Sequence, residues 1–177
     1  VDKSDFTVVD LTEQQKSVAP PKLYDLTALQ RDANSIYGYT AQQTLDYLQS
    51  LYEKKLATYP RTDSNYITDD MESTAKNLIE SVYGVYEKIP QTPTDVTKVI
   101  NNAKVSDHHA LLPTEQITSY DLSSLPTAEY NILFMLAVRL CVATGDDYVY
   151  RTFTCELKSN NSCLLYTSPS PRDTERS

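Results

Sequence analysis

The sequence has few cysteines, no long apolar run and no excess of basic residues, and each shortage excludes a class of protein. Its three cysteines are Cys141, Cys155 and Cys163, and no two of them form a Cys-x-x-Cys pair. A zinc ribbon and a disulfide framework are therefore excluded, and reduced thiols in a cytosolic protein are expected. No apolar run reaches the roughly 18 residues of a membrane-spanning helix. The apolar stretch over residues 132–138 has the length of a core segment.

The third shortage concerns charge. Lysine and arginine number 16 against 24 aspartates and glutamates, so the formal net charge is −8. Non-specific affinity for nucleic acid comes from lysine and arginine side chains that neutralise phosphates. Composition alone therefore argues against a nucleic-acid-binding protein. Any basic surface must be local, or it must be supplied by domains that the chain lacks.

The C-terminal residues differ in character from the rest of the chain. Residues 163–173, CLLYTSPSPRD, resemble an in-frame translation of the transposon adapter used to prepare sequencing libraries. We expect residues 163–177 to be such a translation and not native, so that the natural sequence stops near Ser162. The alternative is a natural disordered tail rich in serine and proline. Because the chain also starts at Val1 without a methionine, we expect a fragment at both ends.

Hydrophobic periodicity and capping residues predict the first elements of the chain. Residues 6–11 are β-rich and predict a strand, and residues 16–22, which contain two prolines, predict a connector. A helix is predicted over residues 27–37, ended by Gly38. A capping box opens a second helix over residues 40–54. Three residues at helical spacing form its apolar face: Leu45, Leu48 and Tyr52.

Two more helices and a second strand complete the pattern. The order of strand, helices and strand predicts an α+β fold that is mainly α, with a helical domain inserted into a β-containing one. The later elements are a helix capped by Thr68 and ended by Gly84, a helix over residues 128–143 capped by Thr127 and closed by Gly145, and a strand over residues 148–157.

The most informative stretch is Thr58-Tyr59-Pro60-Arg61-Thr62-Asp63-Ser64. A tyrosine hydroxyl can attack a phosphodiester, but with an ordinary pKa of about 10 it is almost wholly neutral at pH 7. It needs a fixed cation nearby, and Arg61 can supply one in a fork suited to phosphate. The chain has 14 tyrosines, so a lone tyrosine would carry no weight. The five fixed residues of Tyr-x-Arg-Thr-Asp-Ser are expected by chance in roughly one of ten thousand chains of this size.

This string resembles the active-site motif of the type IA DNA topoisomerases, and Tyr-Pro-Arg-Thr-Asp is most similar to the topoisomerase III branch. Residues 107–114, DHHALLPT, resemble the family's His-x-Ala-x-x-Pro segment, whose first histidine lies near the scissile phosphate. Leu29-Gln30 and residues 49–53, QSLYE, add a third similarity upstream. The similarities follow the family's order over residues 21–114, and weaker similarity extends to Lys158.

The resemblance implies three catalytic residues. Tyr59 is the expected nucleophile, Arg61 would stabilise the charged transition state, and His108 would hydrogen-bond a phosphate oxygen. His109 is adjacent, so the sequence leaves either histidine open for that role. Further residues would bind DNA or support the site: Gln49, Glu53, Thr58, Thr62, Asp63, Ser64 and His109.

These supporting roles have local reasons as well as alternatives. Gln49 and Glu53 lie four residues apart on one face of the predicted helix over residues 40–54. In the family, a glutamine and a glutamate at matching positions line the region around the active site, whereas a solvated helix face is equally open from spacing alone. The three residues after Arg61 offer hydroxyls and a carboxylate that could cap the turn after Tyr59 or position Arg61.

The reaction implied by the resemblance is a transesterification on single-stranded DNA. Tyr59 would form a 5′-phosphotyrosine bond and expel the 3′-hydroxyl, and a second strand would pass before the first is rejoined. DNA would be relaxed or decatenated without ATP. The complete enzyme would need Mg2+, bound by a TOPRIM domain that is missing here, and we assign no metal ligand to this chain. We expect the chain alone to be inactive.

The resemblance also implies partners and a location. Single-stranded DNA is the expected partner and a helicase a further one, with no membrane and a monomeric state. The expected location is the bacterial cytoplasm, in association with DNA. Acidic side chains would then face away from DNA: Asp69, Asp70, Glu72, Glu80 and Glu87.

The family's toroid implies a domain map, in which a helical active-site domain is inserted into a β-rich arch. Residues 1–22 would be the end of the arch and a linker, and residues 23–117 the helical domain with the catalytic tyrosine. Residues 118–146 would form a connecting helix and residues 147–162 the returning arch strand. The remaining residues 163–177 are those expected to be the adapter translation.

Other classes of function stay open. In a non-catalytic single-stranded DNA-binding module, Tyr59 would stack on a base and Arg61 would hold phosphate. A helical interaction domain would be consistent with the acidic charge. A tyrosine recombinase also uses tyrosine and arginine, but it makes a 3′-phosphotyrosine bond and lacks this contiguous string.

Overall fold

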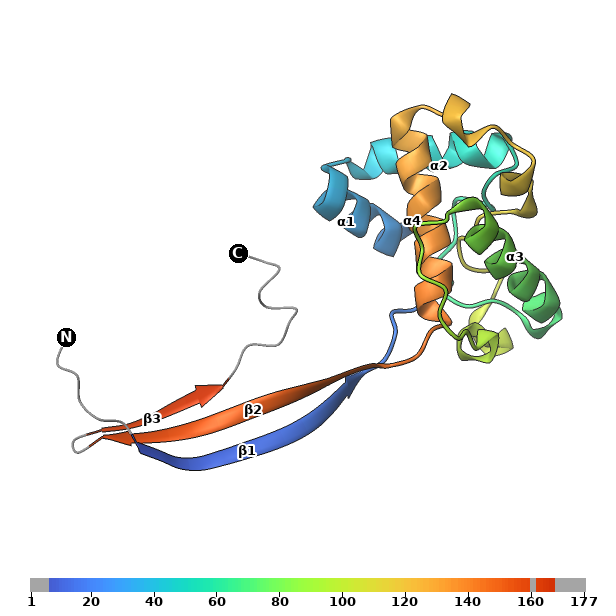
Figure 1. The fold of residues 1–177 in the computed structure, drawn as a ribbon. Coiled ribbons are helices and arrows are strands. Elements are labelled where there is room, and N and C mark those ends of the chain that lie inside the picture. Colours follow the sequence, from blue (N-terminus) through green and yellow to red (C-terminus); the bar gives the residue numbers. More distant parts are fainter. Residues whose placement is uncertain (1–6, 160–161, 168–177) are drawn as a thin grey trace. The chain divides into compact units, whose positions relative to one another are not determined.

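The computed structural model describes residues 7–159 and 162–167 of the chain. They belong to two compact units (Figure 1). Unit 1 combines the two ends of the chain, up to Ala19 and from Asp147 onward, and unit 2 is the continuous segment Pro20–Asp146. The prediction of an α+β fold that is mainly α is confirmed.

Unit 1 is an antiparallel sheet in the order β1-β2-β3. The pairing of β1 with β2 starts at Val18 opposite Tyr148, and its register shifts between Val8 and Asp10. Such an irregularity bends a strand locally and increases its twist. The strands are β1 (Thr7–Val18), β2 (Tyr148–Ser159) and β3 (Ser162–Thr167).

Both long strands exceed their predicted lengths. The prediction for residues 6–11 was too short, because β1 continues to Val18 through residues 12–17, TEQQKS, which have little intrinsic β preference. Backbone pairing with β2 supplies hydrogen bonds that local propensity does not foretell, so the predicted connector begins only after Val18. No strand was expected at β3, which lies almost wholly in the segment interpreted as an adapter translation.

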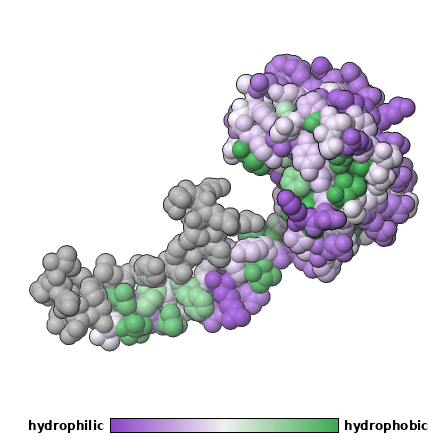
Figure 2. Space-filling model, turned by 45° about the horizontal axis from the view of Figure 1, so that its top comes forward, coloured by the Kyte–Doolittle hydropathy of each residue, from purple (hydrophilic) through white to green (hydrophobic). Residues whose placement is uncertain are grey.

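Apolar side chains remain exposed on the described part of unit 1, and they are visible along the strands (Figure 2). Within residues 7–19 and 147–157 of this unit, no side chain belongs to the buried core. The largest exposed fractions are those of Leu11 at 62%, Val8 at 55% and Val9 at 54%.

Unit 2 contains the core, and α4 runs through its middle with α1 on one side and α3 on the other (Figure 1). α4 buries nine of its residues and packs against α2 and α3. A helix that is apolar around most of its circumference is expected at the centre of a domain. The helices are α1 (Leu26–Tyr37), α2 (Ala41–Glu53), α3 (Glu72–Val85) and α4 (Thr127–Ala143).

The first two helices begin and end through local capping chemistry. α1 ends at Gly38, whose φ of 73° lies in the left-handed region that favours glycine. Its N-cap is Asp25, which accepts a hydrogen bond from the Ala28 N–H at 2.7 Å, so the helix starts one residue earlier than predicted. The capping box of α2 is confirmed: Thr40 accepts from the Gln43 N–H, and the Gln43 side chain accepts from the Thr40 N–H.

Three predictions at the ends of α3 and α4 were wrong. Gly84 does not end α3, because its backbone stays helical and the Tyr86 N–H still reaches the Val82 carbonyl oxygen at 2.8 Å. Thr68 makes no capping hydrogen bond, and a 3-10 turn over Asp69–Met71 precedes the helix instead. Thr127 is the first helical residue of α4 and not its cap, the N-cap position being held by Pro126.

A partly buried polar cluster connects α1 and α4 to the chain that leads into α1. Arg139 on α4 donates to the Tyr24 hydroxyl at 2.7 Å, forms an ion pair with Asp32 on α1, and stacks over the Tyr24 ring at 3.9 Å. Burial raises the pKa of Tyr24, and the hydrogen bond from Arg139 opposes that shift. The Tyr24 carbonyl oxygen accepts from the Leu111 N–H at 2.8 Å, so the cluster also fixes the strand-like segment that carries Leu111.

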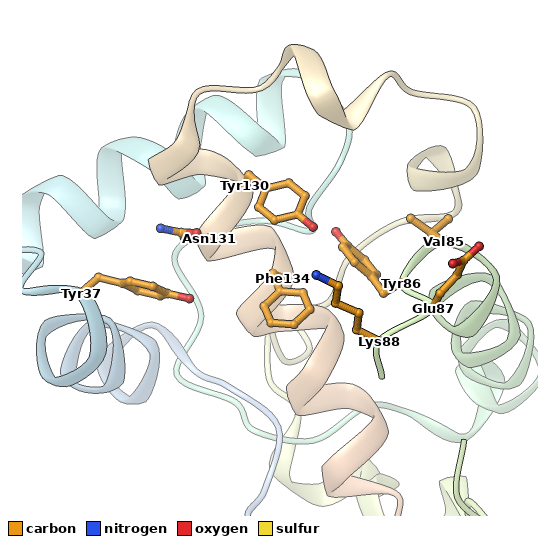
Figure 3. Close-up of a pocket in the computed structure, with 8 residues that line it drawn as sticks. All are labelled: Tyr37, Val85, Tyr86, Glu87, Lys88, Tyr130, Asn131 and Phe134. Atoms are coloured by element: carbon orange, nitrogen blue, oxygen red, sulfur yellow. The ribbon is translucent and has the colours of Figure 1, made fainter. Parts of the chain in front are cut away.

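An aromatic cluster joins the end of α3 to α4 and borders an open pocket of 510 Å³ (Figure 3). Tyr86 packs edge-on against Phe134 and Tyr130, with ring centroids 5.4 and 6.1 Å apart. Its side chain is 5% exposed, and its hydroxyl has no hydrogen-bond partner in the described part of the chain. Burial raises the pKa of this phenol well above its ordinary value. The hydroxyl therefore loses hydration without a compensating bond.

We expect the Tyr86→Phe substitution to stabilise this chain. Removing a buried hydroxyl that has no partner among the described residues removes a desolvation cost of about 1 kcal/mol and leaves the ring contacts in place. Urea unfolding followed by circular dichroism measures the change. Tyr130→Phe is the matched control, because Tyr130 is 36% exposed. Loss of its hydroxyl should change the free energy of unfolding by less than about 0.5 kcal/mol. A Tyr86→Phe chain less stable than the parent would reveal a hidden partner of the hydroxyl.

Candidate active site

The two motif segments of the sequence lie side by side in unit 2. Thr58 is the main link between them: its N–H donates to the Leu112 carbonyl oxygen at 3.0 Å, and its hydroxyl accepts from the Leu112 N–H at 2.9 Å. An isolated bridge pairs Ala57 with Pro113, and the Thr114 N–H donates to the Leu56 carbonyl oxygen. Hydrogen bonds across more than fifty residues of sequence thus set the position of the backbone before Tyr59.

The residues after Tyr59 alternate between buried and exposed side chains, as expected of an extended segment. Thr62 and Ser64 are 7% and 4% exposed. The Thr62 hydroxyl donates to the His108 carbonyl oxygen at 3.0 Å and accepts from the Ser64 N–H at 3.1 Å. Arg61 and Asp63 alternate with these two buried residues, and their side chains are exposed to solvent. The buried hydroxyls therefore hold the two segments together, and the charged side chains are presented outward.

Tyr59 is 37% exposed, and its ring lies between two other rings. The His108 ring is 4.2 Å away between centroids and tilted by 32°, and the Tyr52 ring is 5.7 Å away and edge-on at 87°. These contacts restrict the rotation of the Tyr59 side chain. The phenol is thus held in position while part of it stays accessible to a ligand.

The structure separates the two histidines. His108 is exposed and contacts the Tyr59 ring. His109 is half-buried, and its Nδ1 donates to the Ala110 carbonyl oxygen at 2.8 Å. The geometry therefore brings His108, and not His109, to Tyr59.

Arg61 lines an open pocket of 410 Å³ next to Tyr59. Among the described residues, Arg61 has no hydrogen bond and no carboxylate partner, so its guanidinium is available to an anion. The first turn of α1 forms one wall, and the N-terminus of a helix also favours negative charge. Two carboxylates on the wall oppose that preference. The lining residues are Leu26, Thr27, Arg61, Thr62, Asp63, Ser106, Asp107 and His108.

Tyr52 on α2 is a neighbour of Tyr59 that the sequence did not predict. Tyr52 was assigned to the apolar face of the helix, but it is 40% exposed and packs edge-on against Tyr59. The spacing of seven residues between the two tyrosines gives no local signal of this contact. Gln49 donates to Glu53 at 3.1 Å, so these two side chains share a face as predicted, and this hydrogen bond joins them to each other and not to Tyr59.

The turn between α2 and Tyr59 contains a residue whose backbone is in the left-handed conformation. Lys55, at φ 60°, follows the C-cap Lys54, and its N–H donates to the Tyr52 carbonyl oxygen. The Leu56 N–H donates to the Leu51 carbonyl oxygen at 2.8 Å, and both leucines are fully buried. This is a Schellman motif, which ends the helix and directs the chain toward Tyr59.

Within residues 7–159 and 162–167, no group of three or more histidine, cysteine, aspartate or glutamate side chains could hold a metal ion. Cys141 and Cys155 are free thiols. None of the described helices has the length and apolar character needed to cross a membrane.

Comparisons with known proteins agree on one family. Residues 1–169 match the family model described as DNA topoisomerase, a range that includes the first residues of the segment interpreted as an adapter translation. A protein of Bacillus cereus named DNA topoisomerase 3 is 37% identical over 172 residues, covering 93% of this chain and 23% of that protein. One of Staphylococcus epidermidis with the same name is 38% identical over 166 residues, covering 89% and 23%.

A solved structure agrees in fold. Full-length topoisomerase I from Thermotoga maritima superposes with a TM-score of 0.68 and 22% sequence identity, covering 93% of this chain and 27% of that chain. At this identity the likeness concerns the fold alone. The present chain spans about a quarter of the length of the relatives it matches.

Proposed function

Because the chain belongs to the DNA topoisomerase family, we propose that it forms part of a type IA enzyme, which breaks and rejoins one DNA strand through Tyr59. The observation that carries this proposal is the placement of Tyr59 against His108, with the exposed Arg61 on the adjoining pocket. A phenol, an imidazole and a guanidinium on an accessible surface are the groups that such a reaction needs, which supports the proposal.

In the proposed reaction the Tyr59 oxygen attacks a backbone phosphorus of single-stranded DNA. A bond forms between Tyr59 and the 5′-phosphate as the bond to the 3′ oxygen breaks. The phenol gives up its proton and the departing 3′ oxygen takes one, so atoms and charge balance. The phosphotyrosine bond keeps the energy of the broken bond, and the 3′-hydroxyl can attack it to restore the strand without ATP.

Arg61 and His108 have separate tasks in this scheme. Arg61 would bind non-bridging phosphate oxygens and offset the negative charge that grows on them in the transition state. His108 would donate a hydrogen bond to the same phosphate while its ring keeps Tyr59 in place. Thr62 positions His108 through its backbone carbonyl.

The complete enzyme needs a metal ion and partners beyond this chain in the proposed reaction. No group of carboxylate, histidine or cysteine side chains in the described residues fits a magnesium site. We infer that Mg2+ binds to a TOPRIM domain outside the chain and that this chain alone is inactive. Single-stranded DNA, and a helicase as a further partner, are the proposed partners of a monomeric enzyme in the bacterial cytoplasm.

The direction of the covalent bond tests the proposed function. The complete enzyme is incubated with single-stranded oligonucleotides labelled on one side of the break or the other and is then denatured. A protein band carrying the 5′-phosphate side of the DNA supports the proposal. Attachment to the 3′-phosphate side would indicate recombinase-type chemistry, and binding without an adduct would indicate a non-catalytic DNA-binding module.

Single substitutions distinguish the two histidines. We expect His108→Ala to lower the rate of adduct formation by about 10- to 100-fold, because it removes one donor to the phosphate and the ring that contacts Tyr59. His109→Gln should leave the rate within about twofold, because that side chain faces the backbone of its neighbour. Single-turnover cleavage at saturating DNA measures both. The opposite pattern would move the role to His109.

A further inference from the structure

A second group of basic side chains lies beyond the motif. Lys22, from the chain that leads into α1, has its Nζ 5.1 Å from the centre of the Tyr66 ring. Lys104, from a 3-10 turn over Asn102–Lys104, has its Nζ 5.2 Å from the same ring. Both lysines are exposed and Tyr66 is half-buried. Two ammonium groups from distant parts of the sequence thus meet at one aromatic ring.

The two lysines of this cluster are not neutralised by ion pairs. Six other basic side chains in the described part form ion pairs: Arg31, Lys54, Lys76, Lys98, Arg139 and Arg151. Neither Lys22 nor Lys104 has a carboxylate partner there. Their Nζ atoms lie within about 10 Å of each other, since each is about 5 Å from the same ring centre. An anion bound near both would be attracted by both charges.

The two lysines make the surroundings of Tyr66 positively charged. Its pKa is lowered, chiefly by a hydrogen bond with Lys22; burial opposes this shift, and the charges of both lysines lower the pKa further. The hydroxyl and the ring thereby hold Lys22 and Lys104 at the edge of the unit.

Hydrogen bonds from the segment that carries Tyr59 and Arg61 also fix this cluster. The single hydroxyl hydrogen of Ser64 is shared between the carbonyl oxygens of Lys104, at 2.9 Å, and Tyr66, at 3.2 Å. The Tyr66 carbonyl oxygen accepts from the Ala110 N–H at 2.9 Å. Tyr66 follows Arg61 by five positions, so their backbones are at most about 18 Å apart. A DNA strand bound at Arg61 can therefore reach the cluster within a few nucleotides.

We propose that Lys22, Tyr66 and Lys104 form a second phosphate-binding site, which holds the backbone of the cleaved DNA strand a few nucleotides away from the phosphate at Tyr59. The inference rests on the proposed function and adds a binding site to it. The ligand is a phosphodiester of the strand, and the site takes no part in the bond exchange. Its contribution is to fix the register of the strand relative to Tyr59.

Salt dependence of DNA binding tests the site in the complete enzyme. The double variant Lys22→Gln with Lys104→Gln should lower the slope of log affinity against log salt by about 0.7 for each phosphate that it no longer neutralises, measured between about 50 and 200 mM salt with a fluorescent single-stranded oligonucleotide. Replacing both lysines with arginine should preserve the slope. The matched control, Lys76→Gln with Lys88→Gln, removes equal charge from another part of unit 2 and should leave the slope unchanged.

Truncated oligonucleotides locate the contact. Shortening the DNA one nucleotide at a time on either side of the break should lower adduct formation by the parent enzyme at one defined length, and the glutamine double variant should show no such step. A thermal unfolding midpoint equal to the parent's shows that the variant is folded.

The outcomes separate this inference from the proposed function. Equal slopes and equal length dependence in the parent and the glutamine double variant would overturn the second site, while the adduct itself still forms. A slope that falls as much in the control double variant would also overturn it, since the effect would then be one of general charge. If the parent enzyme forms no adduct, the proposed function fails first.

Discussion

Replacing Tyr59 with phenylalanine in the complete enzyme will abolish the covalent adduct with DNA. Phenylalanine keeps the ring that packs against His108 and Tyr52 but lacks the oxygen that attacks phosphorus. The other hydroxyls of the segment cannot take its place, because those of Thr62 and Ser64 are buried and bonded to backbone carbonyls. The adduct should therefore fall below detection after denaturation, at any time of incubation.

The same variant should still fold and still bind single-stranded DNA. Its unfolding midpoint and its affinity for an oligonucleotide should match those of the parent, because the packing of the ring and Arg61 are unchanged. Tyr37→Phe is a suitable control, since Tyr37 is as exposed as Tyr59, at 36% against 37%, but lies on α1 outside the candidate site. An adduct that persists in the Tyr59→Phe enzyme and disappears in another tyrosine variant would reassign the nucleophile.

Substitution of Arg61 should give the second largest effect. Arg61→Ala is expected to slow adduct formation at saturating DNA by about 100- to 1,000-fold, the loss typical when one preorganised donor to a transition-state charge is removed. Arg61→Lys should recover only part of the rate, because an ammonium keeps the charge but not the two-pronged geometry. Single-turnover kinetics with a labelled oligonucleotide measure both rates.

The free energy of unfolding distinguishes a slower reaction from a loss of folded protein. Because Arg61 is exposed and has no ion pair in the described part of the chain, its loss should change the free energy of unfolding by less than about 0.5 kcal/mol. Arg31→Ala removes another exposed arginine from the same unit and should leave the cleavage rate unchanged. A normal rate in Arg61→Ala would show that the transition-state charge is balanced by other groups of the enzyme.

Local sequence signals predicted the helices well where side chains bond within one turn. The capping box of Thr40 and Gln43 and the left-handed Gly38 are such signals, and both are present. Gly84 carried the same signal as Gly38 but lies inside α3, because glycine permits the left-handed conformation without requiring it. The residues after Thr12 in β1 have little β preference, so only pairing with β2 makes them a strand.

The candidate site also has features that the local sequence predicted and features that it did not. Tyr59 and Arg61 stand in one contiguous string, which is why the sequence singled them out, and their catalytic roles stay a prediction. The contacts that assemble the site could not be predicted, because the bonds from Thr58 to Leu112 and from Thr62 to His108 cross long stretches of chain and leave no periodic trace. The edge-on contact of Tyr52 and the meeting of the lysines at Tyr66 belong to this second kind.

The joining of two distant segments around Tyr59 also bears on how the protein is made. His108 is 49 residues downstream of Tyr59, and at about 5 to 20 residues per second a ribosome adds it roughly 2 to 10 s later. Until then the growing chain lacks His108 and the segment whose backbone hydrogen bonds set the position of Tyr59. The candidate site can therefore assemble only once translation has passed Thr114.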